Sequence, residues 1–146
     1  GSSYSMASVI AGLVWGFVAT IVMTMTMMAV GDGGPPPTAA LVAKFAGGTP
    51  EEHKKPGMLL HMLYGTIAGA VFAVGVPLVG LSLDSIGVAI GLGFVYGVVL
   101  MIGGMVFWLR LVIGVEPDKD MMKVFGIVHV VYGVVLGALL GTGILA

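Results

Sequence analysis

Two histidines occupy the same short pattern, once in each half of the chain. The pattern is a lysine, a histidine six residues later, and then Tyr-Gly and Gly-Ala pairs; its histidines are His61 and His129, 68 residues apart. Imidazole ligates metals and haem and carries protons. Both histidines lie in long apolar stretches, where an ionisable side chain is costly and is first interpreted as functional. The pair is therefore the first candidate site.

Glycines follow each histidine at helical spacing. In a helix, residues four and eight positions further on share a face. The predicted cofactor-binding set is His61, Tyr64, Gly65, Gly69, His129, Tyr132, Gly133 and Gly137. Two imidazoles above glycine faces favour a flat cofactor, namely haem b held by both histidines. In the alternative, the glycines admit a neighbouring helix, and each histidine is a structural residue bonded to a tyrosine or a backbone carbonyl.

Methionines form a second candidate site. Two Met-x-x-x-Met pairs fall in apolar stretches, at Met23 and Met27 and at Met101 and Met105. Thioether sulfur is a soft ligand that suits Cu(I), and the spacing resembles a motif of copper-uptake channels over these five residues. Methionine is also a flexible filler of irregular cores. The sequence therefore predicts either a copper site or ordinary packing.

The sequence offers no catalytic constellation. It has no cysteine, no serine beside a histidine at the spacing of a nucleophile elbow, and no acid inside an apolar stretch. Three threonines, Thr20, Thr24 and Thr26, are expected to bond the carbonyl four residues earlier in a helix. We therefore expect a non-enzymatic protein.

Composition determines the environment in which these residues must work. Of 146 residues, 58% are hydrophobic and 9% are charged, whereas a soluble domain has about 25% charged residues. The absence of cysteine excludes a disulfide scaffold, and the apolar content excludes a disordered chain. A net charge of −1 without a basic run argues against nucleic acid as a partner. An integral membrane protein remains, with the lipid bilayer as its partner.

Four apolar stretches are long enough to cross a bilayer as helices. They are residues 8–30, 57–80, 86–110 and 123–146. Residues 1–5 resemble an expression scar, so that residues 6–146 form a single transmembrane domain. Loop 31–56 is predicted to lie at the interface, with a short amphipathic helix over 38–46 and a helix start at Thr49 and Pro50.

The basic residues indicate an orientation. All six fall in or beside the first and third loops, at Lys44, Lys54, Lys55, Arg110, Lys119 and Lys123. The turn between the second and third spans carries only Asp84. Because basic loops stay in the cytoplasm, both long loops are predicted there and both termini outside.

The predicted fold is all-α, an integral membrane four-helix bundle built from two tandem two-helix repeats. The second and fourth spans align without a gap at the 68-residue spacing, and Gly12 and Gly16 weakly echo Gly93 and Gly97 in the first and third. A unit of two helices returns the chain to its starting side, so a pseudo-two-fold axis lies along the membrane normal. The small-xxx-small faces predict tight packing and a homo-oligomer.

Several segments together suggest a resemblance. They are Met23, the Gly-Gly-Pro-Pro-Pro-Thr-Ala-Ala stretch at 33–40, residues 56–65, Phe107-Trp108 and residues 128–133. In these the chain resembles small four-span membrane proteins of unknown function from halophilic archaea. The resemblance covers nearly the whole chain and implies a fold of four spans, but no activity.

Two functions follow as hypotheses. The first is a binding or scaffold protein of the membrane centred on His61 and His129, with bis-histidine haem b as its sharpest form. The second is a small ion or solute transporter, for copper among other cargoes, with its site at the repeat interface. Side chains that filled the space between the two histidines would favour a structural pair, whereas a cavity there would favour a ligand.

Overall fold

The computed structural model describes residues 5–145. Residues 1–4 of the predicted expression scar lie outside the described part. Ser5 is described, and its side chain accepts a hydrogen bond from the backbone N–H of Ser8, which caps the first helix.

The described chain is helical, with connecting turns and loops. The elements are α1 (Met6–Val30), α2 (Pro37–Ala46), the 3-10 turn η1 (Pro50–His53), α3 (Lys54–Leu78), α4 (Ile86–Gly103), the π-helix η2 (Gly104–Ile113) and α5 (Lys119–Gly141). Four helical segments, with η1 and α3 forming one and α4 and η2 another, are long and apolar enough to cross a membrane. The all-helical class and the four long apolar helices are as predicted.

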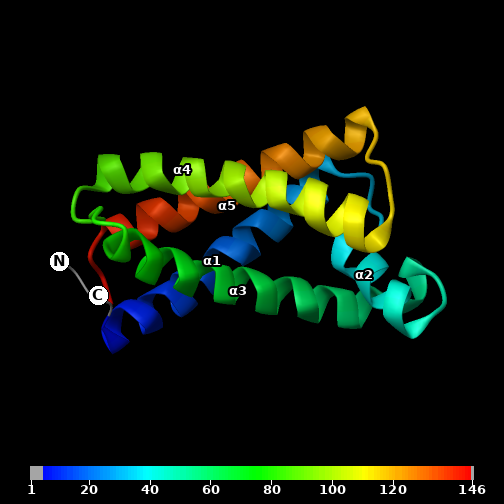
Figure 1. Ribbon diagram of the computed structural model, residues 1–146, viewed down its shortest axis with the longest axis horizontal. Coiled ribbons are helices and arrows are strands. Elements are labelled where there is room, and N and C mark those ends of the chain that lie inside the picture. Colours follow the sequence, from blue (N-terminus) through cyan, green and yellow to red (C-terminus); the bar gives the residue numbers. More distant parts are fainter. Residues whose placement is uncertain (1–4, 146) are drawn as a thin grey trace.

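The long helices run roughly along one axis of the molecule (Figure 1). One end holds α2, η1 and the connection between η2 and α5, and we call it the loop end. The other end holds the short turn between α3 and α4, the start of α1 and the end of α5, and we call it the turn end. The lysines and the arginine lie at or near the loop end, in α2, at the start of α3, in η2 and at the start of α5.

Helix boundaries follow local chemistry. Thr49 and Glu52 form a reciprocal capping box at the start of η1, and Asp118 accepts from the N–H of Met121 at the start of α5. Gly114 ends η2 in the left-handed region, with φ of 83°, a conformation that side chains disfavour. The fourth helix therefore begins four residues before the predicted span.

Glycines bring the helices together in two pairs. Gly12 and Gly16 of α1 lie against the backbone of α3 at Gly65 and Gly69. A methyl group at Gly16 would approach the Gly65 carbonyl oxygen to 2.9 Å, too close for a real side chain. Each hairpin is thus packed backbone to backbone, since α4 meets α5 in the same manner.

The α4–α5 contact uses its own set of small residues. They are Ala89, Gly93 and Gly97 on α4, and Gly133, Gly137 and Gly141 on α5. These contacts bury the helices' small faces and turn their larger apolar side chains either to the centre or outward.

Contact between α1 and α5 joins the two hairpins, whereas α3 does not pack closely against α4 or η2 within the described residues. The centre is filled by buried side chains from three helices, including Phe72 of α3 and Tyr132, Leu136 and Leu140 of α5. The bundle is therefore closed on three sides by helix packing and on the fourth mainly by side chains.

The third long helix changes character near its end. From Gly104 it continues as a π-helix to Ile113, three residues beyond the predicted limit at Arg110. Gly104 is buried, and a methyl group there would strike the ring of Phe125 on α5 at 2.6 Å. π-Helical segments are rare and often occur at functional sites.

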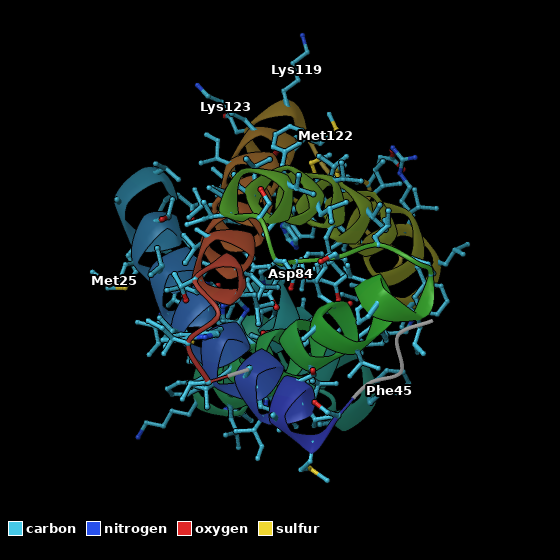
Figure 2. All side chains as sticks on the ribbon, turned by 90° about the vertical axis from the view of Figure 1, so that its left-hand side faces the viewer. Met25, Phe45, Asp84, Lys119, Met122 and Lys123 are labelled. Carbon is cyan, nitrogen blue, oxygen red and sulfur yellow. The ribbon has the colours of Figure 1, made fainter. Side chains whose placement is uncertain are left out.

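The outer surface is apolar around the bundle. Met25 and Phe45, which are 64% and 77% exposed, project outward, and Lys119 and Lys123 extend away from the helices (Figure 2). A soluble protein rarely exposes so many large apolar side chains. The surface is one that suits lipid.

Candidate functional site

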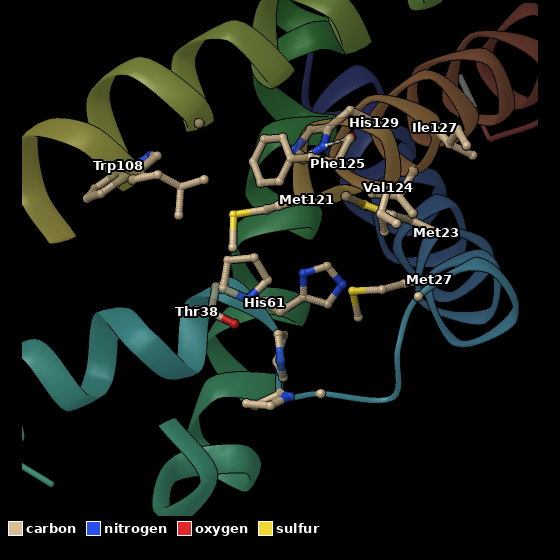
Figure 3. A pocket seen from close by; sticks show the side chains of 18 of the residues that line it. Met23, Met27, Thr38, His61, Trp108, Met121, Val124, Phe125, Ile127 and His129 are labelled. Carbon is tan, nitrogen blue, oxygen red and sulfur yellow. Dashed lines mark hydrogen bonds between the residues drawn. The ribbon is translucent and has the colours of Figure 1, made fainter. Parts of the chain in front are cut away.

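A cavity of about 1210 Å³ opens at the loop end of the bundle. Residues of α1, α3, η2 and α5 line it, together with the proline stretch that precedes α2. Both His61 and His129 are among the lining residues (Figure 3). Ligand pockets usually measure about 300–1,000 Å³ and are mostly apolar with a few polar groups. The cavity is large enough for a sizeable ligand.

His61 is held by a threonine of the neighbouring helix. Its Nε2 lies 3.0 Å from Oγ1 of Thr24 on α1. The Thr24 hydroxyl donates its single hydrogen to the carbonyl oxygen of Thr20, at 2.7 Å. His61 Nε2–H is therefore the donor to Thr24, and the lone pair of this imidazole is on Nδ1.

His129 is held by its own helix. Its Nδ1–H donates to the backbone carbonyl oxygen of Phe125 at 2.7 Å, drawn as a dashed line in Figure 3. The ring of Phe125 stacks on the imidazole with ring centres 4.2 Å apart. The lone pair is then on Nε2. Histidines that ligate metals commonly donate their other N–H to a carbonyl in this way.

The second nitrogen of each imidazole remains accessible. His61 Nδ1 and His129 Nε2 have no hydrogen-bond partner among the described residues. In the same part of the chain, no buried side-chain nitrogen or oxygen lacks a partner. Neither nitrogen is therefore fully enclosed, and each belongs to a residue that lines the cavity.

The two tyrosines of the repeated pattern have different roles. Tyr132 is buried at the cavity floor, and its hydroxyl donates to the Gly65 carbonyl oxygen at 2.6 Å. Tyr64 lines the cavity wall, and its ring lies edge-on to Trp108 of η2. Tyr132 thus seals the cavity toward the turn end, whereas Tyr64 borders its side.

The glycines predicted beneath the histidines lie at helix contacts. Gly69 packs on Gly12 and Gly16, while Gly133 and Gly137 pack on α4. Gly65 alone of the four predicted glycines lines the cavity, where it also contacts Thr20. The glycines therefore pack against neighbouring helices, as in the alternative interpretation. The cavity lies beside the histidines, toward the loop end.

The methionine pairs are separated by the fold. Met23 and Met27 line the cavity, together with Met58 and Met121. Met101 and Met105 are not among the lining residues, and Met101 packs near Gly126 of α5. Only the first Met-x-x-x-Met pair is therefore placed with the histidines. Between residues 5 and 145, no three or more His, Cys, Asp or Glu side chains gather as a metal site.

Charged side chains gather where the cavity opens. Its lining includes four acids and one lysine, namely Asp32, Glu51, Asp118, Asp120 and Lys123. They lie on the loops and on the first turn of α5. The opening is thus more acidic than the rest of the cavity, which is lined chiefly by apolar residues.

Three contributors to the site were not predicted as such. Thr20, Thr24 and Thr26 each bond the carbonyl four residues earlier, as expected, but Thr24 also holds His61. Phe125 precedes His129 by one helical turn, so helical spacing alone could have identified it. Trp108 lines the cavity from η2, and the π-helical form of that segment has no sequence signal.

Comparison of the chain with protein families, with curated proteins and with solved structures found no match.

Proposed function

We propose that the chain is a non-enzymatic membrane protein that binds a small, largely apolar ligand in the loop-end cavity. The observation that carries this proposal is the accessible nitrogen on each of His61 and His129 in one cavity of about 1210 Å³. The cavity walls are mostly apolar, and the two imidazoles supply acceptors for a metal centre or a hydrogen-bond donor.

Haem b is the sharpest form of this ligand. His129 is already oriented as an axial ligand, because its Nδ1–H is bonded to a carbonyl and its Nε2 is accessible. His61 presents Nδ1 in the present arrangement, and ligation through Nε2 would require its ring to give up the Thr24 bond. Haem would supply iron and a flat apolar body, and the chain would supply the ligands and exclude water.

Titration of the purified protein with haem b tests the proposal through the Soret band. We expect a shifted band that His129→Ala abolishes and His61→Ala alters. His53→Ala is the matched control, because His53 bonds the Gly47 carbonyl in an exposed loop and does not line the cavity. A band that never shifts, or that shifts alike in all three variants, would reject haem ligation by this pair.

We propose a small cation transporter as the second candidate, on the basis of a second cavity. This turn-end cavity measures about 390 Å³ and is lined by residues of α1, α3, α5 and the α3–α4 turn. Along α5 the two cavities are separated by the stretch from Tyr132 to Leu140, about 12 Å at 1.5 Å per residue. A path between these two cavities would cross the bundle, and a barrier that opened toward one cavity at a time would give alternating access.

Copper(I) flux into proteoliposomes tests this second candidate. The acidic opening would attract cations, and Met23 and Met27 would offer soft ligands inside. We expect flux that Met23→Leu with Met27→Leu removes. The matched control is Met101→Leu with Met105→Leu, which changes the same residue type away from the cavity. Absence of flux, or equal flux in both double variants, would reject the copper path.

We also infer that the two hairpins are tandem repeats about an axis along the membrane normal. In support, Gly16 meets Gly65 and Gly69 as Gly93 meets Gly133 and Gly137. Under this proposal Gly16 corresponds to Gly93, one helical turn from the correspondence of Gly12 with Gly93 that the sequence suggested. Self-association would then use Gly87 and Gly91, where an added methyl group meets nothing within 4 Å.

A further inference from the structure

The helix contacts around the main cavity differ in kind. At the α1–α3 and α4–α5 contacts the backbones touch through glycine, which leaves no space for passage. Between α3 and the α4–η2 helix, only side chains cross. We call this boundary the α3–η2 seam. It lies on the side of the bundle, where a membrane protein faces lipid.

Specific contacts hold the α3–η2 seam closed at its turn end and at its loop end. Toward the turn end, the Tyr96 hydroxyl donates to the Ala68 carbonyl oxygen at 2.6 Å, and its ring packs on Phe72 at 4.7 Å. Toward the loop end, α2 contacts both α3 and η2, and the Thr38 hydroxyl donates to the Gly57 carbonyl oxygen at 2.5 Å. The turn-end edge is therefore held by a hydrogen bond across the seam, and the loop-end edge by α2, which is bonded to α3 and also packs on η2.

Between these edges the seam is bridged by one aromatic pair. Tyr64 of α3 and Trp108 of η2 meet edge-on with ring centres 6.3 Å apart. Both residues line the main cavity, and Tyr64 is also 42% exposed on the outside. The pair is therefore a wall one side chain thick between the cavity and the outer surface.

The contact between Tyr64 and Trp108 is weaker than the contacts at the two ends of the seam. The Trp108 Nε1–H reaches the Tyr64 hydroxyl oxygen at 3.4 Å, beyond the usual range for such hydrogen bonds of about 2.7–3.2 Å. Trp108 stands on the π-helix, which lacks the regular α-helical bonding of α4. Rotation of two aromatic side chains would open the seam without separating the helices that glycines hold together.

We propose that the α3–η2 seam is a lateral portal through which the ligand of the main cavity exchanges with the bilayer. The ligand is then an amphiphile dissolved in lipid, with an apolar body and a polar centre or group that reaches the two imidazoles. This inference rests on the proposed binding function. The opening among the acidic loops serves as the alternative route, for a ligand taken from water.

Exchange of haem b with phosphatidylcholine vesicles tests the portal. Loading and release are followed at the Soret band in stopped flow. In Trp108→Ala we expect both rates to rise by about tenfold, as when a gate limits exchange. If Trp108 only contacted the ligand, its removal would raise the release rate and leave the loading rate unchanged. Phe94→Ala is the matched control, because Phe94 is 47% exposed on α4, does not line the cavity and makes no aromatic contact with Trp108.

Closing the portal supplies the converse experiment. The chain has no cysteine, so Tyr64→Cys with Trp108→Cys can be joined by a bis-maleimide without other reaction. We expect both rates to fall in the cross-linked protein and to rise in the same variant before cross-linking. Saturable binding with rates that neither change affects would overturn the portal alone. An absence of saturable binding by the unmodified protein would overturn the binding function and the portal with it.

Discussion

The hydroxyl of Tyr132 on α5 donates a hydrogen bond of 2.6 Å to the carbonyl oxygen of Gly65 on α3, across the centre of the bundle. Both residues belong to the repeated pattern, one in each copy, and Tyr132 is 2% exposed. The bond links helices that do not pack directly on each other. It also defines the cavity floor, one helical turn from both histidines.

Tyr132→Phe is expected to destabilise the bundle. The change removes one buried hydrogen bond and leaves the ring in place, so the loss should be about 1–2 kcal/mol. Unfolding in mixed detergent micelles measures it. Tyr64→Phe is the control, because Tyr64 is half-exposed and only accepts a long bond from Trp108. Equal losses in both variants would contradict a special role for the central bond.

Gly133→Ala is expected to disrupt the α4–α5 contact. A methyl group there would collide with the backbone of Gly93 and Gly97, so the helices must move apart. Gly75→Ala is the control, since nothing lies within 4 Å of its new methyl group, it is outside the proposed self-association face, and alanine favours the helix by about 1 kcal/mol. In thermal unfolding, Gly133→Ala should lower the midpoint temperature and the control should raise it. An unchanged midpoint in Gly133→Ala would reject the packing argument.

Much of this architecture was predictable, because apolar runs of membrane length and the glycine spacing are direct sequence signals. Pro37 and Gly47 mark the limits of α2, and Asp118 marks the start of α5. The π-helix from Gly104 was not predictable, and neither was the contact at its start between the ring of Phe125 and the buried Gly104. Such a contact depends on tertiary packing and leaves no period in the sequence.

The candidate site was predictable only in its residue types. The repeat identified His61 and His129, but it placed their glycines in a cofactor floor, whereas three of the four pack against other helices away from the cavity. A glycine face serves a ligand and a neighbouring helix equally well, so spacing alone does not distinguish the two. The partner of His61 on α1 depends on how α1 and α3 pair, which the sequence does not state.

Thr24→Val is expected to strengthen haem ligation by His61. Valine keeps the shape of threonine and removes the hydroxyl that engages Nε2, a bond worth about 0.5–1.5 kcal/mol and hence about two- to tenfold in affinity. The absorption spectrum should show more six-coordinate, low-spin haem. Thr26→Val is the control, because the Thr26 hydroxyl bonds only the Val22 carbonyl. A spectrum identical to that of the unchanged protein would remove His61 from the second axial position.

The placement of charge predicts which end of the bundle faces the cytoplasm. All six basic residues lie at or near the loop end, in α2 or at the adjoining ends of α3, η2 and α5, and the turn end carries Asp84. Because the chain has no cysteine, Lys119→Cys and Ser82→Cys each introduce one exposed thiol, at the loop end and the turn end respectively.

A membrane-impermeant maleimide applied to intact cells should then label Ser82→Cys and spare Lys119→Cys. Both thiols should react after the membrane is permeabilised, which controls for their exposure. The opposite labelling in intact cells would place the acidic cavity opening outside. Ligand from the water phase would then reach the histidines from the exterior, and the positive-inside argument would fail for this chain.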